Sequence, residues 1–225
     1  MKQALINCPS LANSSLLELE EDIRQFWNSG VRWFHIDIMD GHYVPNLCYP
    51  VRLVADLKAK YPQAIADVHM MVTDPAAYGG AAGADYVSFH ADSTHFVIRS
   101  LRAIREVGMK AGIVLNPSQQ VDVIRPYLDW VDLVVLMTVE PGFAGQKFMV
   151  ESLPRLEELS KLREETGKEF LISIDGGINY PNVQPCVRRG ANLFVTGVYT
   201  VYRQPDGIPA ACQRFEQEMR KGLVE

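Results

Sequence analysis

The chain has 225 residues, of which 48% are hydrophobic and 22% charged. This composition is typical of a globular protein and excludes a disordered or collagen-like chain. The formal net charge of −5 argues against a general nucleic-acid binder, which needs a basic surface for phosphates.

Membrane and secretory features are not expected from this sequence. No apolar run approaches the roughly 20 residues that cross a bilayer, and the apolar stretch near the N-terminus is too short for a signal peptide. The cysteines, Cys8, Cys48, Cys186 and Cys212, form no CxxC pair. We therefore expect a cytoplasmic protein with reduced thiols and with no membrane or nucleic-acid partner.

Short apolar runs alternate with longer segments of helical i, i+3, i+4 spacing along the whole chain. The expected strands are 4–7, 33–38, 64–70, 85–89, 110–115, 132–137, 169–174 and 192–196. The expected helices are 15–28, 50–60, 75–82, 94–107, 119–127, 149–166, 181–189 and 207–222. Eight such alternations predict a single-domain (β/α)8 TIM barrel over residues 1–225. The competing open sheet usually has GxGxxG after its first strand, where this chain has Cys8-Pro9-Ser10-Leu11.

Polar side chains occupy the ends of three predicted strands, where barrels of this kind carry their chemistry. His35 and Asp37 alternate onto one face of the second strand, His69 lies in the third, and Asp175 ends the seventh. A lone histidine there is more often a hydrogen-bonded core residue. Two imidazoles and two carboxylates at one depth instead predict a divalent metal site, for zinc, iron(II), manganese or cobalt.

The remaining histidines do not share this placement. His42 and His95 are expected on the surface, and His90 stays unassigned.

Glycine-rich segments follow the last three predicted strands. They are Glu140–Gln146, Gly176-Gly177 and Gly197. Because glycine lets backbone N–H groups approach an anion closely, the three segments together predict a phosphate site, although any one alone is equally well a plain turn. Three methionines, Met39, Met71 and Met137, also fall at strand ends. They are either core packing or an adaptable apolar lid over a bound polyol.

Together these segments resemble the ribulose-phosphate 3-epimerase family. The segments that carry the resemblance are Cys8–Leu11, His35–Asn46, Asp67–Val72, Asn116–Pro117, Met137–Gln146 and Ile174–Asn179. The resemblance implies a barrel that inverts C3 of a ketose phosphate around one divalent metal ion. It implies His35, Asp37, His69 and Asp175 as metal ligands, with Asp37 and Asp175 also the acid–base pair. It implies Ser10 and His69 as sugar contacts and Met39, Met71 and Met137 as a methionine cap. The implied substrate and phosphate contacts are Gly142, Phe143, Ala144, Gly145, Gly176, Gly177, Gly197 and Val198.

The chain departs from the family pattern after Gly197, where Val198 stands in place of the usual serine, so a hydroxyl contact to phosphate is lost. The expected reaction interconverts D-ribulose 5-phosphate and D-xylulose 5-phosphate, but the same motifs fit D-allulose 6-phosphate 3-epimerases. A barrel aldolase or decarboxylase would need a lysine at an inner strand end, which is missing. A non-catalytic sugar-phosphate binder is a third alternative. By resemblance, we expect a homo-oligomer, either a dimer or a hexamer.

Overall fold

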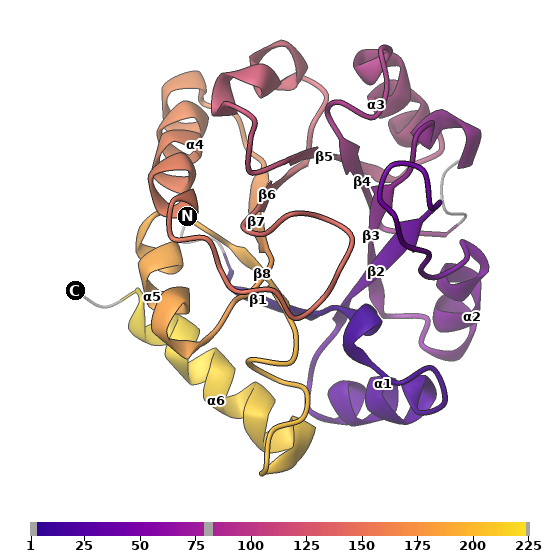
Figure 1. Cartoon of the computed structure of the whole chain (residues 1–225), viewed down its shortest axis with the longest axis vertical. Helices are drawn as coiled ribbons and strands as arrows, with labels where there is room; N and C mark the ends of the chain where they lie inside the picture. The colour runs from indigo at the N-terminus through magenta and orange to yellow at the C-terminus, as the bar shows by residue number, and fades with distance from the viewer. Residues whose placement is uncertain (1–3, 79–82, 224–225) are drawn as a thin grey trace.

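The computed structural model describes residues 4–78 and 83–223. They form eight parallel strands in the order β1-β8-β7-β6-β5-β4-β3-β2. The strands are β1 Ile6–Pro9, β2 Trp33–Met39, β3 Ile65–Met71, β4 Tyr86–His90, β5 Lys110–Leu115, β6 Leu133–Met137, β7 Leu171–Asp175 and β8 Leu193–Thr196. In Figure 1 the strands occupy the centre and the helices surround them. The predicted (β/α)8 barrel is confirmed.

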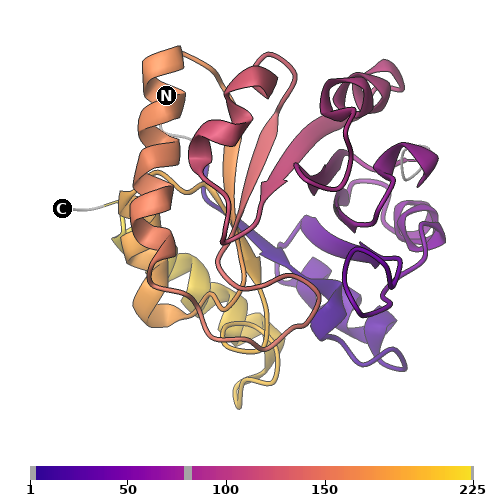
Figure 2. The ribbon, with the colours of Figure 1, turned by 45° about the horizontal axis from the view of Figure 1, so that its top comes forward.

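The outer ring consists of α-helices and short 3₁₀ helices. The α-helices are α1 Leu19–Asn28, α2 Arg52–Lys60, α3 Val97–Glu106, α4 Ser152–Thr166, α5 Tyr180–Arg188 and α6 Gly207–Lys221, and the 3₁₀ helices cover Leu11–Asn13, Pro75–Tyr78 and Val121–Tyr127. Figure 2 shows α4, α5 and α6 together along one side of the barrel. Among the described residues, no helix is both long and apolar enough to cross a membrane.

Strand side chains alternate between two separate cores, as the pleat of a strand requires. The larger core lies between the strands and the helices and includes Phe34, Ile36 and Val68. The barrel interior instead holds two small apolar clusters, one around Val135 and one around Leu193. At the inward-facing positions of β2, β3 and β4, in contrast, buried polar side chains predominate.

The barrel closes between β1 and β2 through a single parallel bridge, Ser10 to His35. The neighbouring pair β2 and β3 is in register over seven positions, and Asp37 is the partner of His69 there. The seam of the barrel therefore runs between two of the residues expected to form the site.

A recurring polar contact locks the bottom of the barrel. Asp85 precedes β4, Asp132 precedes β6 and Asn192 precedes β8. Each of these side chains accepts a hydrogen bond from a backbone N–H of the preceding strand, at 2.8, 3.0 and 3.2 Å respectively. This contact explains why Gly-Ala-Asp and Gly-Ala-Asn recur before strands in the sequence: each acidic or amide side chain satisfies a donor at a strand start.

The structure corrects several predicted elements. The expected helix 15–28 begins at Leu19, because residues 15–18 form a turn closed by the Glu18 N–H on the Ser15 carbonyl. The expected helix 119–127 is a 3₁₀ helix that contains Pro126, which lacks the N–H that an α-helix needs there. The expected helix 75–82 is a 3₁₀ helix over Pro75–Tyr78, and residues 79–82 lie outside the described part. The first strand is displaced, from 4–7 to Ile6–Pro9.

Candidate active site

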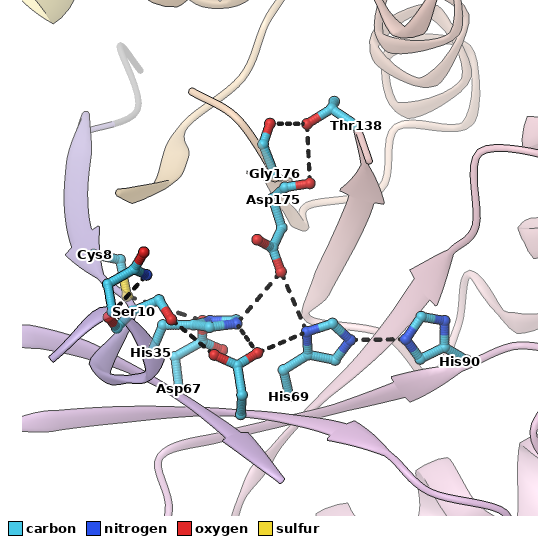
Figure 3. Close-up of polar contacts among 11 residues, drawn as sticks. Cys8, Ser10, His35, Asp67, His69, His90, Thr138, Asp175 and Gly176 are labelled. Atoms are coloured by element: carbon cyan, nitrogen blue, oxygen red, sulfur yellow. Dashed lines mark hydrogen bonds and ion pairs between the residues drawn. The ribbon is translucent and has the colours of Figure 1, made fainter. Parts of the chain in front are cut away.

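Four side chains from three strands converge at the mouth of the barrel (Figure 3). Asp37 Oδ1 lies 3.4 Å from His35 Nε2 and 3.6 Å from His69 Nδ1. Asp175 Oδ2 lies 3.5 Å and 3.2 Å from the same two nitrogens. These are the four residues that the sequence predicts for a metal site, and the structure brings all four together.

The cluster is suited to a divalent cation. His35 Nε2 and His69 Nδ1 are both buried and face carboxylate oxygens at 3.2 to 3.6 Å, but neither makes a hydrogen bond. A buried polar atom without a hydrogen bond is costly. The four donor atoms lie within 4.8 Å of one another. Ligands at about 2.0–2.1 Å from a zinc ion are about 3.3 Å apart in a tetrahedral shell, which agrees with the separations of 3.2 to 3.6 Å. The residues present therefore fit a metal ion.

Opposite charges dominate the electrostatics of the cluster. Burial lowers the pKa of His35, but the negative charges of Asp37 and Asp67 outweigh burial and leave this pKa well above its usual value. Burial raises the pKa of Asp175, but its contacts with His35 and His69 outweigh burial and hold this pKa well below its usual range. Asp175 is therefore ionised at neutral pH, as a metal ligand or a base must be.

Neighbouring groups hold Asp37 by its carboxylate and Asp175 by its backbone. Ser10 Oγ donates to Asp37 Oδ2 at 2.8 Å, so Asp37 has one oxygen on the serine and the other in the cluster. Thr138, just after β6, donates its N–H to the Asp175 carbonyl at 2.8 Å and its hydroxyl to the same carbonyl at 2.9 Å. The backbone beneath Asp175 is thereby held on the end of β6.

Asp67 is a site residue that sequence reasoning missed. Its side chain is fully buried, and its Oδ2 lies 2.8 Å from His35 Nδ1, which leaves Nε2 of that ring for the cluster. Cys8 Sγ donates to the same oxygen at 4.0 Å, and burial raises the pKa of Cys8 well above its usual value, so it remains a thiol. Strand alternation places Asp67 and His69 on one face, which was the available signal.

His90 is the second missed residue. Its ring is fully buried at the end of β4, and its Nε2 lies 2.8 Å from His69 Nε2. Burial, and then the neighbouring His69, lower the pKa of His90 well below its usual value, so the ring is neutral. His42 and His95, in contrast, are exposed as expected.

The three methionines line the cleft above this cluster. Met39, Met71 and Met137 all contribute to its wall. Met71 and Met137 are almost fully buried, so packing and a lining role coexist in the same side chains.

The three glycine segments also line this cleft. The loop after β6 crosses the centre of the view in Figure 1. In this loop Gly142 is buried, whereas Phe143, Ala144 and Gly145 are exposed. A Cβ on Gly177 would lie 2.3 Å from the Phe148 backbone nitrogen, so only glycine allows this approach.

Side chains on either side of the cleft hold this loop. Asn46 Nδ2 donates to the Gly142 carbonyl at 2.7 Å, and Tyr199 Oη donates to the Gly145 carbonyl at 2.7 Å. The Gly197 N–H donates to Thr200 Oγ1 at 3.2 Å, so this predicted phosphate donor already has a partner. The Val198 side chain packs on the outer core.

Asp40 connects the turn after β2 to the turn after β3. Its carboxylate accepts from the N–H groups of His42, Tyr43 and Thr73 and from the Thr73 hydroxyl, at 2.8 to 3.0 Å. Burial raises the pKa of Asp40, but these hydrogen bonds outweigh burial and lower it to about 2.

Comparison with known proteins agrees with this geometry. The model of the ribulose-phosphate 3-epimerase family matches residues 6–201, which contain the whole cluster and the glycine segments. The chain belongs to the ribulose-phosphate 3-epimerase family. The Bacillus subtilis ribulose-phosphate 3-epimerase is 41% identical over 208 residues, which cover 88% of this chain and 92% of that protein. The Escherichia coli K12 ribulose-phosphate 3-epimerase is 35% identical over 228 residues, with 100% and 98% coverage.

More distant solved structures share the fold. The 3-hexulose-6-phosphate synthase of Salmonella typhimurium superposes with a TM-score of 0.71 at 17% identity, covering 97% of this chain and 100% of that chain. The 3-keto-L-gulonate-6-phosphate decarboxylase of Vibrio cholerae has a TM-score of 0.67 at 14% identity, with 97% and 99% coverage. At this identity the likeness concerns the barrel alone, whereas the sequence relatives place the chain among epimerases.

Proposed function

We propose that this chain interconverts D-ribulose 5-phosphate and D-xylulose 5-phosphate by inverting the configuration at C3. The observation that carries the proposal is a pair of carboxylates, Asp37 and Asp175, which reach the mouth from different strands around two imidazole nitrogens that make no hydrogen bond. The names of the sequence relatives support the same reaction.

Inversion at C3 needs two acid–base groups, one on each side of the carbon. The C3 proton is acidic because it lies next to the C2 carbonyl, and its removal leaves an ene-diolate. In our proposal one of Asp37 and Asp175 takes this proton, and the other delivers a proton to the opposite face. The direction of reaction reverses their roles. Their side chains are 9% and 14% exposed, so each carboxylate can reach a substrate in the cleft.

The proposed ligands of a divalent cation are His35, Asp37, His69 and Asp175. When bound, the cation would stabilise negative charge that develops on the C2 oxygen. Zinc is our first choice because the set contains two imidazoles and two carboxylates, and iron(II), manganese and cobalt accept the same donors. The Ser10 contact on Asp37 and the Asp67 contact on His35 keep these two side chains turned toward the cluster.

The rest of the cleft is proposed to bind the sugar phosphate. We assign Ser10 and His69 to the sugar. Because one nitrogen of His69 contacts His90 and the other belongs to the proposed ligands, this ring offers the sugar only its carbon edge. Met39, Met71 and Met137 exclude water above the sugar. The phosphate end is formed by Gly142, Phe143, Ala144, Gly145, Gly176, Gly177, Gly197 and Val198, all of which line the cleft. Since Val198 has no hydroxyl and the Gly197 N–H is engaged, we assign the phosphate mainly to the backbone of the two other glycine segments.

The test is a proton NMR time course with zinc-loaded protein and each of two substrates, ribulose 5-phosphate and allulose 6-phosphate. We expect the C3 epimer of ribulose 5-phosphate to appear faster. Faster conversion of allulose 6-phosphate would assign the chain to the six-carbon branch. Binding of both without conversion would contradict the catalytic proposal. A cytoplasmic location and a dimeric or hexameric assembly are further proposals, and light scattering of the purified chain tests the latter.

A further inference from the structure

The contact between His69 and His90 imposes a choice of proton positions. The two Nε2 atoms are 2.8 Å apart, and the rings stack with centroids 4.9 Å apart. Both side chains are fully buried. A hydrogen bond between two imidazole nitrogens contains a single proton, so one ring donates and the other accepts. Figure 3 shows this contact on the side of His69 that faces away from Asp175.

The other nitrogen of His69 determines which ring is the donor. His69 Nδ1 lies 3.2 Å from Asp175 Oδ2 and 3.6 Å from Asp37 Oδ1. For this nitrogen to offer a lone pair to a cation, the ring proton must be on Nε2. His90 Nε2 is then the acceptor, and the proton of His90 must be on its Nδ1.

That second proton also needs an acceptor, and Asn116 is the neighbour that can provide one. His90 Nδ1 and Asn116 Oδ1 are both buried without a hydrogen-bond partner, and Asn116 is hydrogen-bonded to Tyr43, whose ring centroid lies 4.6 Å from that of His90. A hydrogen bond between these two atoms would satisfy both.

The Asn116 amide is held in the orientation that this role needs. Its Nδ2 donates to Tyr43 Oη at 2.7 Å and to Asp92 Oδ2 at 3.1 Å, which leaves Oδ1 as the free acceptor. Tyr43 Oη in turn donates to Asp92 Oδ1 at 2.7 Å, and its ring lies 4.6 Å from the His90 ring. Every donor thus points outward from the cluster toward the Asp92 carboxylate.

We propose that His90, oriented by Asn116 and Tyr43, is a positioning residue that keeps the His69 proton on Nε2 and so leaves Nδ1 free for the cation. His90 then does for His69 what the Asp67 carboxylate does for His35. This inference rests on the proposed metal site, but the tautomer itself can be tested without metal. Because the partner of His69 is an imidazole and not a carboxylate, it orients the ligand without adding a further negative charge beside Asp37, Asp67 and Asp175.

The test compares two substitutions of His90. His90→Phe keeps a ring but removes the acceptor, whereas His90→Gln can place its Oε1 near the original Nε2 position. Zinc affinity is measured by chelator competition, and kcat and KM are measured with ribulose 5-phosphate. The histidine tautomers are determined from long-range ¹H–¹⁵N spectra of the metal-free protein. His95→Phe, at an exposed histidine, is the matched control, and circular dichroism verifies folding.

We expect His69 to be protonated on Nε2 in the metal-free wild type. We expect His90→Phe to weaken zinc binding about 10- to 100-fold, with kcat falling more than KM rises. His90→Gln should recover most of the zinc affinity, and His95→Phe should match the wild type.

Three results would overturn the inference. The first is a His69 proton on Nδ1 in the metal-free protein, and the second is wild-type zinc affinity in a folded His90→Phe variant. The third is a loss of zinc affinity in His90→Gln as large as in His90→Phe, which would indicate that only the packing of the ring matters. If the wild type binds no zinc but its His69 proton is on Nε2, the proposed metal site fails while the positioning role stands. If His90→Phe does not fold, Tyr43→Phe replaces it in the test, because this variant keeps its ring beside His90. Tyr43→Phe should weaken zinc binding by a smaller factor, and unchanged zinc binding would overturn the inference.

Discussion

Replacing either mouth carboxylate with its amide separates the two proton-transfer steps. Asp37 Oδ1 and Asp175 Oδ2 lie at similar distances from the two imidazole nitrogens, 3.4 and 3.6 Å against 3.5 and 3.2 Å. We therefore expect Asp37→Asn and Asp175→Asn to lower the zinc affinity by similar factors. Assays at saturating zinc compensate for this loss of affinity. Loss of one acid–base group costs about 10²- to 10⁴-fold in turnover, or about 3–5 kcal/mol of transition-state stabilisation.

The remaining carboxylate keeps its own half of the reaction. In heavy water, we expect Asp37→Asn to exchange the C3 proton of one epimer and Asp175→Asn that of the other, with almost no interconversion in either variant. Proton NMR of each ketose phosphate measures both processes. Asp67→Asn is the control, because its buried carboxylate contacts His35 and not the cleft: it should slow both exchanges equally. Near-normal epimerisation in either mouth variant would refute the two-carboxylate assignment.

Three further outcomes follow from contacts in the loops around the mouth of the barrel. Asp40→Asn should lower the melting temperature at pH 7, and the difference in melting temperature from the wild type should shrink as the pH falls from about 4 toward 2. The reason is that a carboxylate whose pKa is lowered to about 2 stabilises the fold only while it is ionised. Thermal unfolding at several pH values measures this difference, and a difference that stays constant would contradict the prediction. Tyr199→Phe should raise KM several-fold with little change in kcat, because the Tyr199 hydroxyl positions the glycine loop through its hydrogen bond to the Gly145 carbonyl. An unchanged KM would show that this hydrogen bond does not position the loop for substrate binding. Gly177→Ala should raise KM by about tenfold or more, since the new Cβ would meet the Phe148 backbone in a left-handed conformation at φ +63°; wild-type KM would show that the loop adapts.

The elements that sequence could predict are those whose signal is local. Alternation along β2 and β3 places His35, Asp37 and His69 inside the barrel, and the fold rule places Asp175 at the same rim. The structure brings these four together. Helical periodicity did not separate an α-helix from the 3₁₀ helix over Val121–Tyr127, because both present apolar residues at three- to four-residue spacing.

Contacts between strands were not accessible in this way. Asp67 and His90 lie on inward faces, but their roles depend on which ring nitrogen each meets, 2.8 Å away on another strand. The hold of Tyr199 on Gly145 joins residues 54 positions apart. No spacing rule encodes such pairs, because they are set by the tilt and register of the closed barrel.

The most direct test of the central claim is the isotope content of C3 in the first product that forms in heavy water. With zinc-loaded wild-type protein, two carboxylates on opposite faces predict that newly formed xylulose 5-phosphate contains solvent deuterium at C3, while unreacted ribulose 5-phosphate keeps its proton. Product that retains the original proton would mean that a single group carries it from one face to the other, which would contradict the assignment of Asp37 and Asp175 as an acid–base pair.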